Sequence, residues 1–309
     1  MYKKSLIVLM LITLIGCSQK EEEVYLFSFF KDNGQDGLHL ASSMDGLKWS
    51  ALNDNKSFLT PEVGEDKLMR DPCIIKGEDD KFHMVWTTGW TDNGIGYANS
   101  TDLIHWSEQK FIPVMAHEPN VMNCWAPEIF YDETTKQYAI FWASTIPGRF
   151  PKSFHPKGRN HRMYYTTTKD FIDFTEAKLL YDKGFTVIDS HIKKDGERYI
   201  MFLKNEVNHD TLHKDIHIAT SKELLGNYSE PSEAITPHWT EGPTCIKIDG
   251  EWVVYFDMYE DHKMGAVKSP DLKNWTDITE TLDFPEGTRH GTVFKVKQSV
   301  LDNILSQKN

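Results

Sequence analysis

The chain has 309 residues, and its 46 acidic side chains outnumber its 34 lysines and arginines, giving a formal net charge of -12. Such a charge argues against nucleic acid or an anionic membrane surface as a partner, and it is compatible with neutral ligands such as sugars. Of four cysteines, the three beyond Cys17 cannot all pair internally. They lie in apolar stretches, which predicts small buried thiols: Cys73, Cys124 and Cys245.

The N-terminus has the features of an export signal. Lys3 and Lys4 precede an apolar run over residues 6–15, which is too short for a comfortable permanent membrane span. The run leads into a Leu-Ile-Gly-Cys tetrapeptide that resembles a bacterial lipobox, whose cysteine, here Cys17, is acylated and becomes the new N-terminus. The polar residues 18–23 suit a solvated tether.

We therefore expect residues 1–23 to be the signal peptide and tether of an exported lipoprotein. The acidic tether resembles the signal that directs some bacterial lipoproteins to the outer cell surface, so the outer membrane is expected, on its cell-surface or periplasmic face. The protein would touch the membrane only through its N-terminal lipid. An ordinary cleaved signal with a chance cysteine is the alternative.

A turn motif recurs through the rest of the chain. It begins with Ser or Thr, has an acidic residue two positions later, and ends in an aromatic residue; its five copies are residues 43–49, 100–106, 168–174, 221–228 and 269–275. Each copy follows a short alternating strand. The hydroxyl and carboxylate suit a tight turn because they accept hydrogen bonds from nearby backbone N–H groups. The aromatic residue then starts the next strand.

A second repeated element, which we call the blade head, lies upstream of these turns and opens an apolar strand. Four heads are Arg70-Asp71-Pro72, Trp125-Ala126-Pro127, Ile188-Asp189-Ser190 and Glu241-Gly242-Pro243. A period of about 45–65 residues with four short strands is typical of propeller blades. The sequence therefore predicts an all-β fold, a five-bladed β-propeller over residues 24–309.

The two ends of the chain complement each other. Residues 25–30 and 37–41 supply strands and a turn without a head, whereas residues 289–294 supply a head without a following turn. Joined, they make the last blade, closed by the N-terminal strands, and leave no exposed sheet edge. The alternative, a β-sandwich with decorative repeats, does not explain five heads and five turns. A helix is expected only around residues 300–304.

Three of the heads carry a carboxylate where the inner strands begin: Asp71, Asp189 and Glu241. In a propeller these positions converge on one face of the ring, and carboxylates beside apolar strand residues are costly to bury without a role or a partner. Convergence on one pocket is the pattern that acid–base chemistry needs. The alternative is that the carboxylates only form salt bridges with Arg70, Arg289 or Lys204.

The ordered heads, ending with Arg289-His290-Gly291, resemble those of glycoside hydrolase family 43 over all of the chain after the tether. The resemblance implies hydrolysis of arabinosides, xylosides or some galactosides with inversion. It implies Asp71 as the general base, Glu241 as the general acid, and Asp189 as the residue that raises the pKa of the acid. Inversion requires base and acid about 6.5–9.5 Å apart, to admit a water.

Other site residues follow from position and from the same resemblance. Trp90 and Trp125 are expected to stack on sugar rings, and Arg289 to hydrogen-bond substrate hydroxyls or the carboxylates. His290 matches a histidine that in some members of the family reaches a calcium ion or a water in the central channel. No cofactor is expected to be required, and a structural calcium in the channel is a possible addition.

Two departures from the pattern leave alternatives open. Arg70 before Asp71-Pro72 resembles glycoside hydrolase family 32, whose nucleophile would lie near Asp32 or Asp36. The sequence around these residues predicts a turn, however, and the C-terminal sandwich domain expected of family 32 does not follow. Asp189 lacks the following proline of many members of family 43, which leaves its auxiliary role less secure.

The resulting prediction is a monomeric, exo-acting α-L-arabinofuranosidase that acts on the side chains of plant polysaccharides or on oligosaccharides. A β-galactosidase or β-xylosidase of the same fold is the first alternative. A carbohydrate-binding propeller without catalysis is the second, although a pure binder needs aromatic platforms rather than three axial carboxylates.

Overall fold

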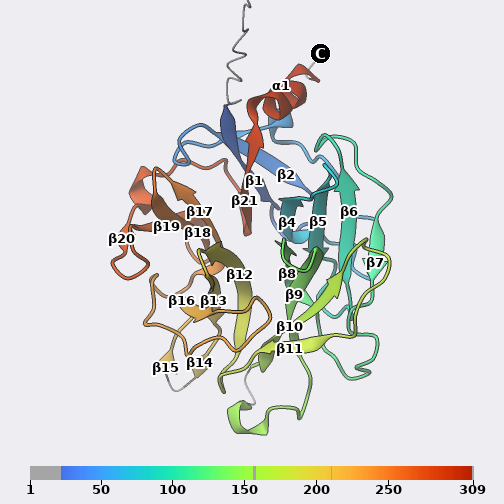
Figure 1. The fold of residues 1–309 in the computed structure, drawn as a ribbon, viewed down its shortest axis with the longest axis vertical. Helices are drawn as coiled ribbons and strands as arrows, with labels where there is room; N and C mark the ends of the chain where they lie inside the picture. Colours follow the sequence, from blue (N-terminus) through green and yellow to red (C-terminus); the bar gives the residue numbers. More distant parts are fainter. Residues whose placement is uncertain (1–21, 156–157, 210, 308–309) are drawn as a thin grey trace, which may run out of the picture.

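The computed structural model describes residues 22–155, 158–209 and 211–307, and Cys17 lies outside these ranges. Five antiparallel sheets surround a central axis, and each sheet is one blade of a propeller (Figure 1). Blade 1 contains β4 (Arg70–Lys76), β5 (Phe82–Thr87), β6 (Ile95–Ser100) and β7 (Lys110–Ile112). Blade 2 contains β8 (Trp125–Asp132), β9 (Gln137–Thr145), β10 (His161–Thr168) and β11 (Lys178–Tyr181).

Blade 4 has the same order, from the axis outward, of β17 (Glu241–Ile248), β18 (Glu251–Met258), β19 (Lys263–Ser269) and β20 (Thr276–Asp277). Blade 5 joins the two ends of the chain in the order β21 (Gly291–Lys297), β1 (Glu23–Phe29), β2 (His39–Ser43) and β3 (Ser50–Ala51). In blade 5, β21 pairs with β1 from Glu23↔Lys297 to Phe29↔Gly291. The predicted closure of the last blade by the N-terminal strands is confirmed.

Blade 3 differs from the prediction of four strands per blade. Its sheet contains β12 (Val187–Asp195), β13 (Arg198–Asn205) and β16 (Asp215–Ser221), while β14 (Asn208–His209) and β15 (Thr211–Leu212) form a separate hairpin. The stretch at the outer position bonds to β16 only at intervals. The N–H groups of Ser229, Ser232 and Ile235 donate to carbonyls of β16, and N–H groups of β16 donate to hydroxyls of the stretch instead of to its carbonyls. Pro231 and Pro237 in this stretch have no N–H to donate, so a regular ladder is not formed.

The helical elements are short. The helix α1 (Gln298–Ser306) follows β21 and covers the predicted residues 300–304. Single 3-10 turns lie at η1 (Asn53–Asn55), η2 (Pro151–Ser153) and η3 (Thr279–Thr281). In the described part of the chain, no helix has the length and apolar character needed to cross a lipid bilayer.

The repeated turn motif does what its chemistry predicts. In the first copy, the hydroxyl of Ser43 accepts a hydrogen bond from the N–H of Gly46 at 2.8 Å, and Asp45 accepts from Leu47 and Lys48 at 2.7 and 2.9 Å. The same contacts recur at Ser100-Thr101-Asp102, Thr168-Lys169-Asp170 and Ser269-Pro270-Asp271. In these four turns, the side chains therefore pair backbone N–H groups where one strand leads into the next.

The core is divided among the five interfaces between neighbouring blades. Each hydrophobic cluster contains residues from two adjacent blades, and two clusters flank the closing blade. Between blades 4 and 5, for example, Phe27 and Trp49 pack edge-on against Tyr255 at ring distances of 6.0 and 5.9 Å. The predicted buried thiols are confirmed: Cys73, Cys124 and Cys245 are free and buried.

A buried polar contact joins the inner strands of four blades. Glu128 of β8 accepts hydrogen bonds from His191 at 2.8 Å and from the thiol of Cys73 at 3.4 Å, and Thr292 donates to its second oxygen at 3.4 Å. All four side chains are buried. This contact holds the inner strands together, and it leaves the head ends of those strands to line the pocket.

Candidate active site

The heads share one backbone device, a β-bulge. The strands β4, β8, β12 and β17 each shift register just after the first residue of the head. The second residue of each head is left-handed, with φ of 53° at Asp71, 47° at Ala126, 49° at Asp189 and 61° at Gly242. A bulge re-aims a side chain, and left-handed non-glycine residues store strain that is typical of functional sites.

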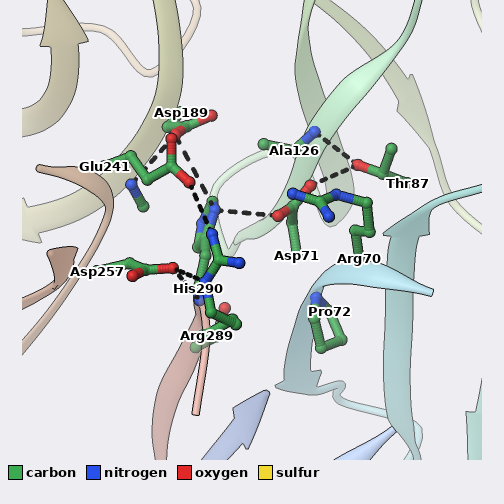
Figure 2. A network of polar contacts seen from close by, with 12 residues as sticks. Arg70, Asp71, Pro72, Thr87, Ala126, Asp189, Glu241, Asp257, Arg289 and His290 are labelled. Atoms are coloured by element: carbon green, nitrogen blue, oxygen red, sulfur yellow. Dashed lines mark hydrogen bonds and ion pairs between the residues drawn. The ribbon is translucent and has the colours of Figure 1, made fainter. Parts of the chain in front are cut away.

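These bulges surround one pocket with a volume of about 270 Å³. It brings together nearly all of the predicted site residues, since its lining includes Asp71, Trp90, Trp125, Asp189, Glu241 and His290. Figure 2 shows Asp71 on one side of His290 and Glu241 with Asp189 on the other. The predicted convergence of three carboxylates from three blades on one pocket is therefore what the structure contains.

Asp71 is held as an anion. Its Oδ2 accepts a hydrogen bond from the hydroxyl of Thr87 at 2.8 Å, and its Oδ1 lies 3.2 Å from Nδ1 of His290. Burial favours the neutral carboxyl, but the charge and hydrogen bond of His290 outweigh it and lower the pKa of Asp71 to about 2. Thr87 also accepts the N–H of Ala126 at 2.8 Å, which orients its hydroxyl toward Asp71.

His290 lies between the carboxylates. Burial alone would lower its pKa, but Asp71, followed by Asp189 and Glu241, raises the pKa to about 9, so the ring is an imidazolium near neutral pH. Its Nδ1 is 4.0 Å from Asp189. A protonated Nδ1 has no lone pair to offer, so this nitrogen does not fit as a calcium ligand. The expected structural calcium remains a prediction, and we derive no step through a metal.

Glu241 forms two ion pairs. Lys204, at the far end of β13, lies 3.0 Å from Oε2, and Arg289 lies 3.4 Å from Oε1. The alternative of salt bridges with Lys204 and Arg289 is thus realised for this carboxylate. Burial alone would raise the pKa of Glu241, but Lys204 outweighs burial and lowers it. The expectation of a raised pKa is wrong for the ligand-free site, because the nearest charges are cations.

Asp189 is the carboxyl with the raised pKa. Burial raises the pKa of Asp189 to about 7, assisted by the charges of Glu241 and Asp71 and opposed by His290. Its Oδ2 accepts the N–H of Gly242 at 3.1 Å, which ties blade 3 to the head of blade 4. Near neutral pH, Asp189 is therefore protonated in part, and its pKa depends on the charge of the neighbouring Glu241.

Arg289 is positioned by a residue that the sequence did not single out. Asp257 on β18 is fully buried and accepts hydrogen bonds from Nε of Arg289 at 2.6 Å and from the N–H of His290 at 3.2 Å. Thr87 is a second positioning residue that was missed. Thr87 and Asp257 each lie on the second strand of a blade, opposite the head of its first strand. Their proximity to the site could therefore have been inferred from the strand register alone.

Two tryptophans form an aromatic wall. Trp90 and Trp125 meet edge-on at 5.6 Å, and the indole N–H of Trp125 donates to the carbonyl of Trp90 at 3.3 Å. The guanidinium of Arg70 lies over the ring of Trp90 at 4.7 Å, and that of Arg159 lies over Trp125 at 4.4 Å. Trp90 is 43% exposed, so its ring is available to a ligand. Arg159 belongs to a loop whose role the sequence did not reveal.

A five-bladed β-propeller whose heads place three carboxylates in one pocket has the features of a glycosidase. Residues 21–302 match a family described as "Probable glycosyl hydrolase domain", which is related to glycoside hydrolase family 43. The chain belongs to this family. The sequence-based identification as a glycoside hydrolase of the family 43 type is confirmed at the level of family and fold.

One named relative is similar in sequence. An α-L-arabinofuranosidase of Bifidobacterium longum subsp. longum is 27% identical over 259 residues, covering 70% of this chain and 24% of the relative. The chain thus spans about a quarter of that protein.

Two solved structures share the fold. The α-L-arabinofuranosidase from Lactobacillus brevis has a TM-score of 0.56 at 17% identity, over 68% of this chain and 72% of its own. The α-L-arabinofuranosidase from Clostridium thermocellum has a TM-score of 0.57 at 14% identity, over 80% and 85%. At such identities the likeness shows the five-bladed fold alone.

Proposed function

We propose that this protein hydrolyses glycosidic bonds at terminal α-L-arabinofuranosyl units, with inversion at the anomeric carbon. One observation carries the proposal: an ionised carboxylate, Asp71, lines the same pocket as Glu241 and as Asp189, a carboxyl with a raised pKa. The name of the Bifidobacterium relative supports the choice of arabinofuranoside. The aromatic wall of Trp90 and Trp125 supports a sugar ligand, because aromatic rings present a large apolar face to a ring-shaped partner.

In the proposed reaction, Asp71 takes a proton from a water as its oxygen bonds to the anomeric carbon. The bond from that carbon to the leaving oxygen breaks, and Glu241, in its protonated form, gives its proton to this oxygen. A pKa of about 2 keeps Asp71 ionised at every working pH. It is a weak base, which suits an oxocarbenium-like transition state in which the water needs little prior deprotonation.

Release of 4-nitrophenol from aryl glycosides tests the proposal. We expect turnover of the α-L-arabinofuranoside, with the β-xyloside and β-galactoside as the two alternative substrates. Proton NMR of the first-formed sugar tests inversion, and a retained anomer would favour the mechanism of family 32. No release from any of these substrates, or from arabinan and arabinogalactan, would favour a binding propeller and overturn the hydrolase.

We further propose that the protein is exported and anchored through an acylated Cys17, and that it acts as a monomer. The family match begins at residue 21 and β1 at Glu23, which leaves a short acidic segment after Cys17 as a tether. Palmitate labelling with membrane fractionation tests the anchor, and Cys17→Ala should abolish both label and membrane association. A labelled variant would contradict it. Light scattering of the soluble form tests the monomer.

A further inference from the structure

We propose that blade 3 carries a binding site for a divalent transition-metal ion such as Zn²⁺, formed by His213, Asp215 and His217 outside the catalytic pocket. Asp215 and His217 alternate in β16, so their side chains share one face of the strand, and the left-handed Lys214, with a φ of 56°, connects His213 to the start of that strand. Each of the three proposed ligands offers one atom, and these atoms all lie within 4.8 Å of one another. Imidazole and carboxylate are ligands that Zn²⁺ commonly takes.

The separations of the ligand atoms suit one small ion. Nε2 of His217 is 2.7 Å from Oδ1 of Asp215, and Nδ1 of His213 is 3.9 Å from the same oxygen. Ligands at about 2.0–2.2 Å from a tetrahedral zinc lie about 3.3–3.6 Å apart. Since the two observed distances lie on either side of that value, small side-chain rotations are enough to admit the ion.

The surrounding groups orient the ligands. Nδ1 of His217 lies 2.7 Å from the carbonyl of Ser232 and donates its proton there, which turns Nε2 toward Asp215. Nδ1 of His238 lies 2.9 Å from Oδ2 of Asp215 and 2.6 Å from the carbonyl of His213. One oxygen of Asp215 is thus held by His238, and the other faces the ligand histidines. Such outer hydrogen bonds are typical of protein metal sites.

Burial distinguishes this cluster from the other His–Asp pairs that lie outside the catalytic pocket. The side chain of Asp215 is 2% exposed, whereas Asp36, Asp79 and Asp102, which each pair with one histidine, are 53%, 46% and 27% exposed. Within the described ranges, the ion-pair partners of Asp215 are histidines, without a lysine or arginine. A buried carboxylate needs a compensating cation, and a bound metal supplies one.

The site adjoins the wall of the catalytic pocket. Lys214, between two of the ligands, lines that pocket and pairs with Glu206, which also pairs with Lys204 at 2.9 Å. The carbonyl of Lys214 accepts the N–H of Thr240 at 3.1 Å. A metal held by His213 and Asp215 would therefore fix the backbone that presents Lys214 to the pocket. Its role is structural, and it takes no part in the proposed hydrolysis.

Titration of the purified, tag-free protein with Zn²⁺ after chelator treatment tests the site, with Co²⁺ absorption as a second probe. We expect one equivalent to bind and to raise the melting temperature. His213→Gln and Asp215→Asn should weaken Zn²⁺ binding at least by the ~10–100-fold that loss of an orienting partner costs. The control is His105→Gln, which removes an exposed histidine from a His–Asp pair and should bind as the wild type.

Absence of stoichiometric binding, or wild-type affinity in both ligand variants, would overturn the site and leave a hydrogen-bonded cluster. His213 is the more exposed ligand, so His213→Gln remains informative if Asp215→Asn does not fold. Zinc binding is measured without substrate, so its failure is distinguishable from failure of the proposed hydrolase activity.

Discussion

Replacing Lys204 by methionine should move the alkaline limb of the pH–rate profile to higher pH. The ammonium lies 3.0 Å from Glu241 and its side chain is 2% exposed, so screening by water is weak. At an effective dielectric constant of 20, this contact amounts to about 5–6 kcal/mol before desolvation is counted. Measured effects of a close opposite charge are smaller, about 1–3 pKa units. Methionine keeps the apolar length without the charge, and Arg289 still partly neutralises Glu241.

The sign follows from which protonation state works. The acid must carry a proton, so kcat/KM should fall as pH rises through the pKa values of the neighbouring carboxyls Asp189 and Glu241, both of which the charge of Lys204 acts to lower. Removing the cation raises the pKa of Glu241, so the limb should move up by about 1–3 units. The assay is kcat/KM on the aryl arabinofuranoside from pH 5 to about 10, within the range where the protein stays folded.

Lys214→Met is the matched control, because Lys214 also pairs with Glu206 and lines the pocket but forms no ion pair with Glu241 within the described ranges. A lower absolute rate in both variants would show only that the pocket prefers a cation. A limb that stays in place in a folded Lys204→Met protein, or moves to lower pH, would refute the electrostatic reasoning.

Glu241→Gln and Asp71→Asn should each lower kcat/KM by at least about 10²–10⁴-fold with an unchanged circular dichroism spectrum, and a near-wild-type rate in either would contradict the roles. The raised pKa of His290 contributes stability that is complete below its ordinary value and is lost as pH rises through about 9. Thermal melts should therefore show up to about 3 kcal/mol less stability at pH 9 than at pH 6.5, with a shallower loss in His290→Gln. Gly242→Ala should lower both melting temperature and kcat, because its Cβ would lie 2.2 Å from Cγ of His290. Gly196→Ala, at the same φ of 61° with nothing within 4 Å, measures the backbone strain alone, and an equal effect of the two would rule out the steric argument.

The fold was predictable because its signals are local and repeated. Each turn motif combines a capping hydroxyl, a capping carboxylate and an aromatic within seven or eight residues, and the heads recur at a steady interval. The missing fourth strand of blade 3 was not predicted, since the effect of Pro231 and Pro237 depends on where that stretch lies. The positions of the three carboxylates could be inferred from the heads. The direction in which the pKa of Glu241 is shifted could not. That direction depends on Lys204, which comes from a neighbouring blade.

The His213–His217 cluster shows the limits of interpreting a strand by its apolar residues. The predicted strand before the turn at residues 221–228 alternates, with Ile216 and Ile218 on its apolar face. The same period of two places Asp215 and His217 on the opposite face. That pair was visible in the sequence, but the contributions of His213, which lies before the strand, and of His238, more than twenty residues away, required the structure.

The bulge at each head explains why the acid differs from the other two carboxylates. Asp71 and Asp189 occupy the left-handed position of their heads, so a short side chain reaches the pocket from there. In blade 4 that position is Gly242, over which the ring of His290 packs too closely for any side chain. A carboxylate can then be supplied only by the preceding residue, which starts farther from the bulge and needs the longer side chain of Glu241. The identity of each acid therefore follows from backbone geometry, and exchanging Asp and Glu at these heads would misplace the carboxylates without changing their charge.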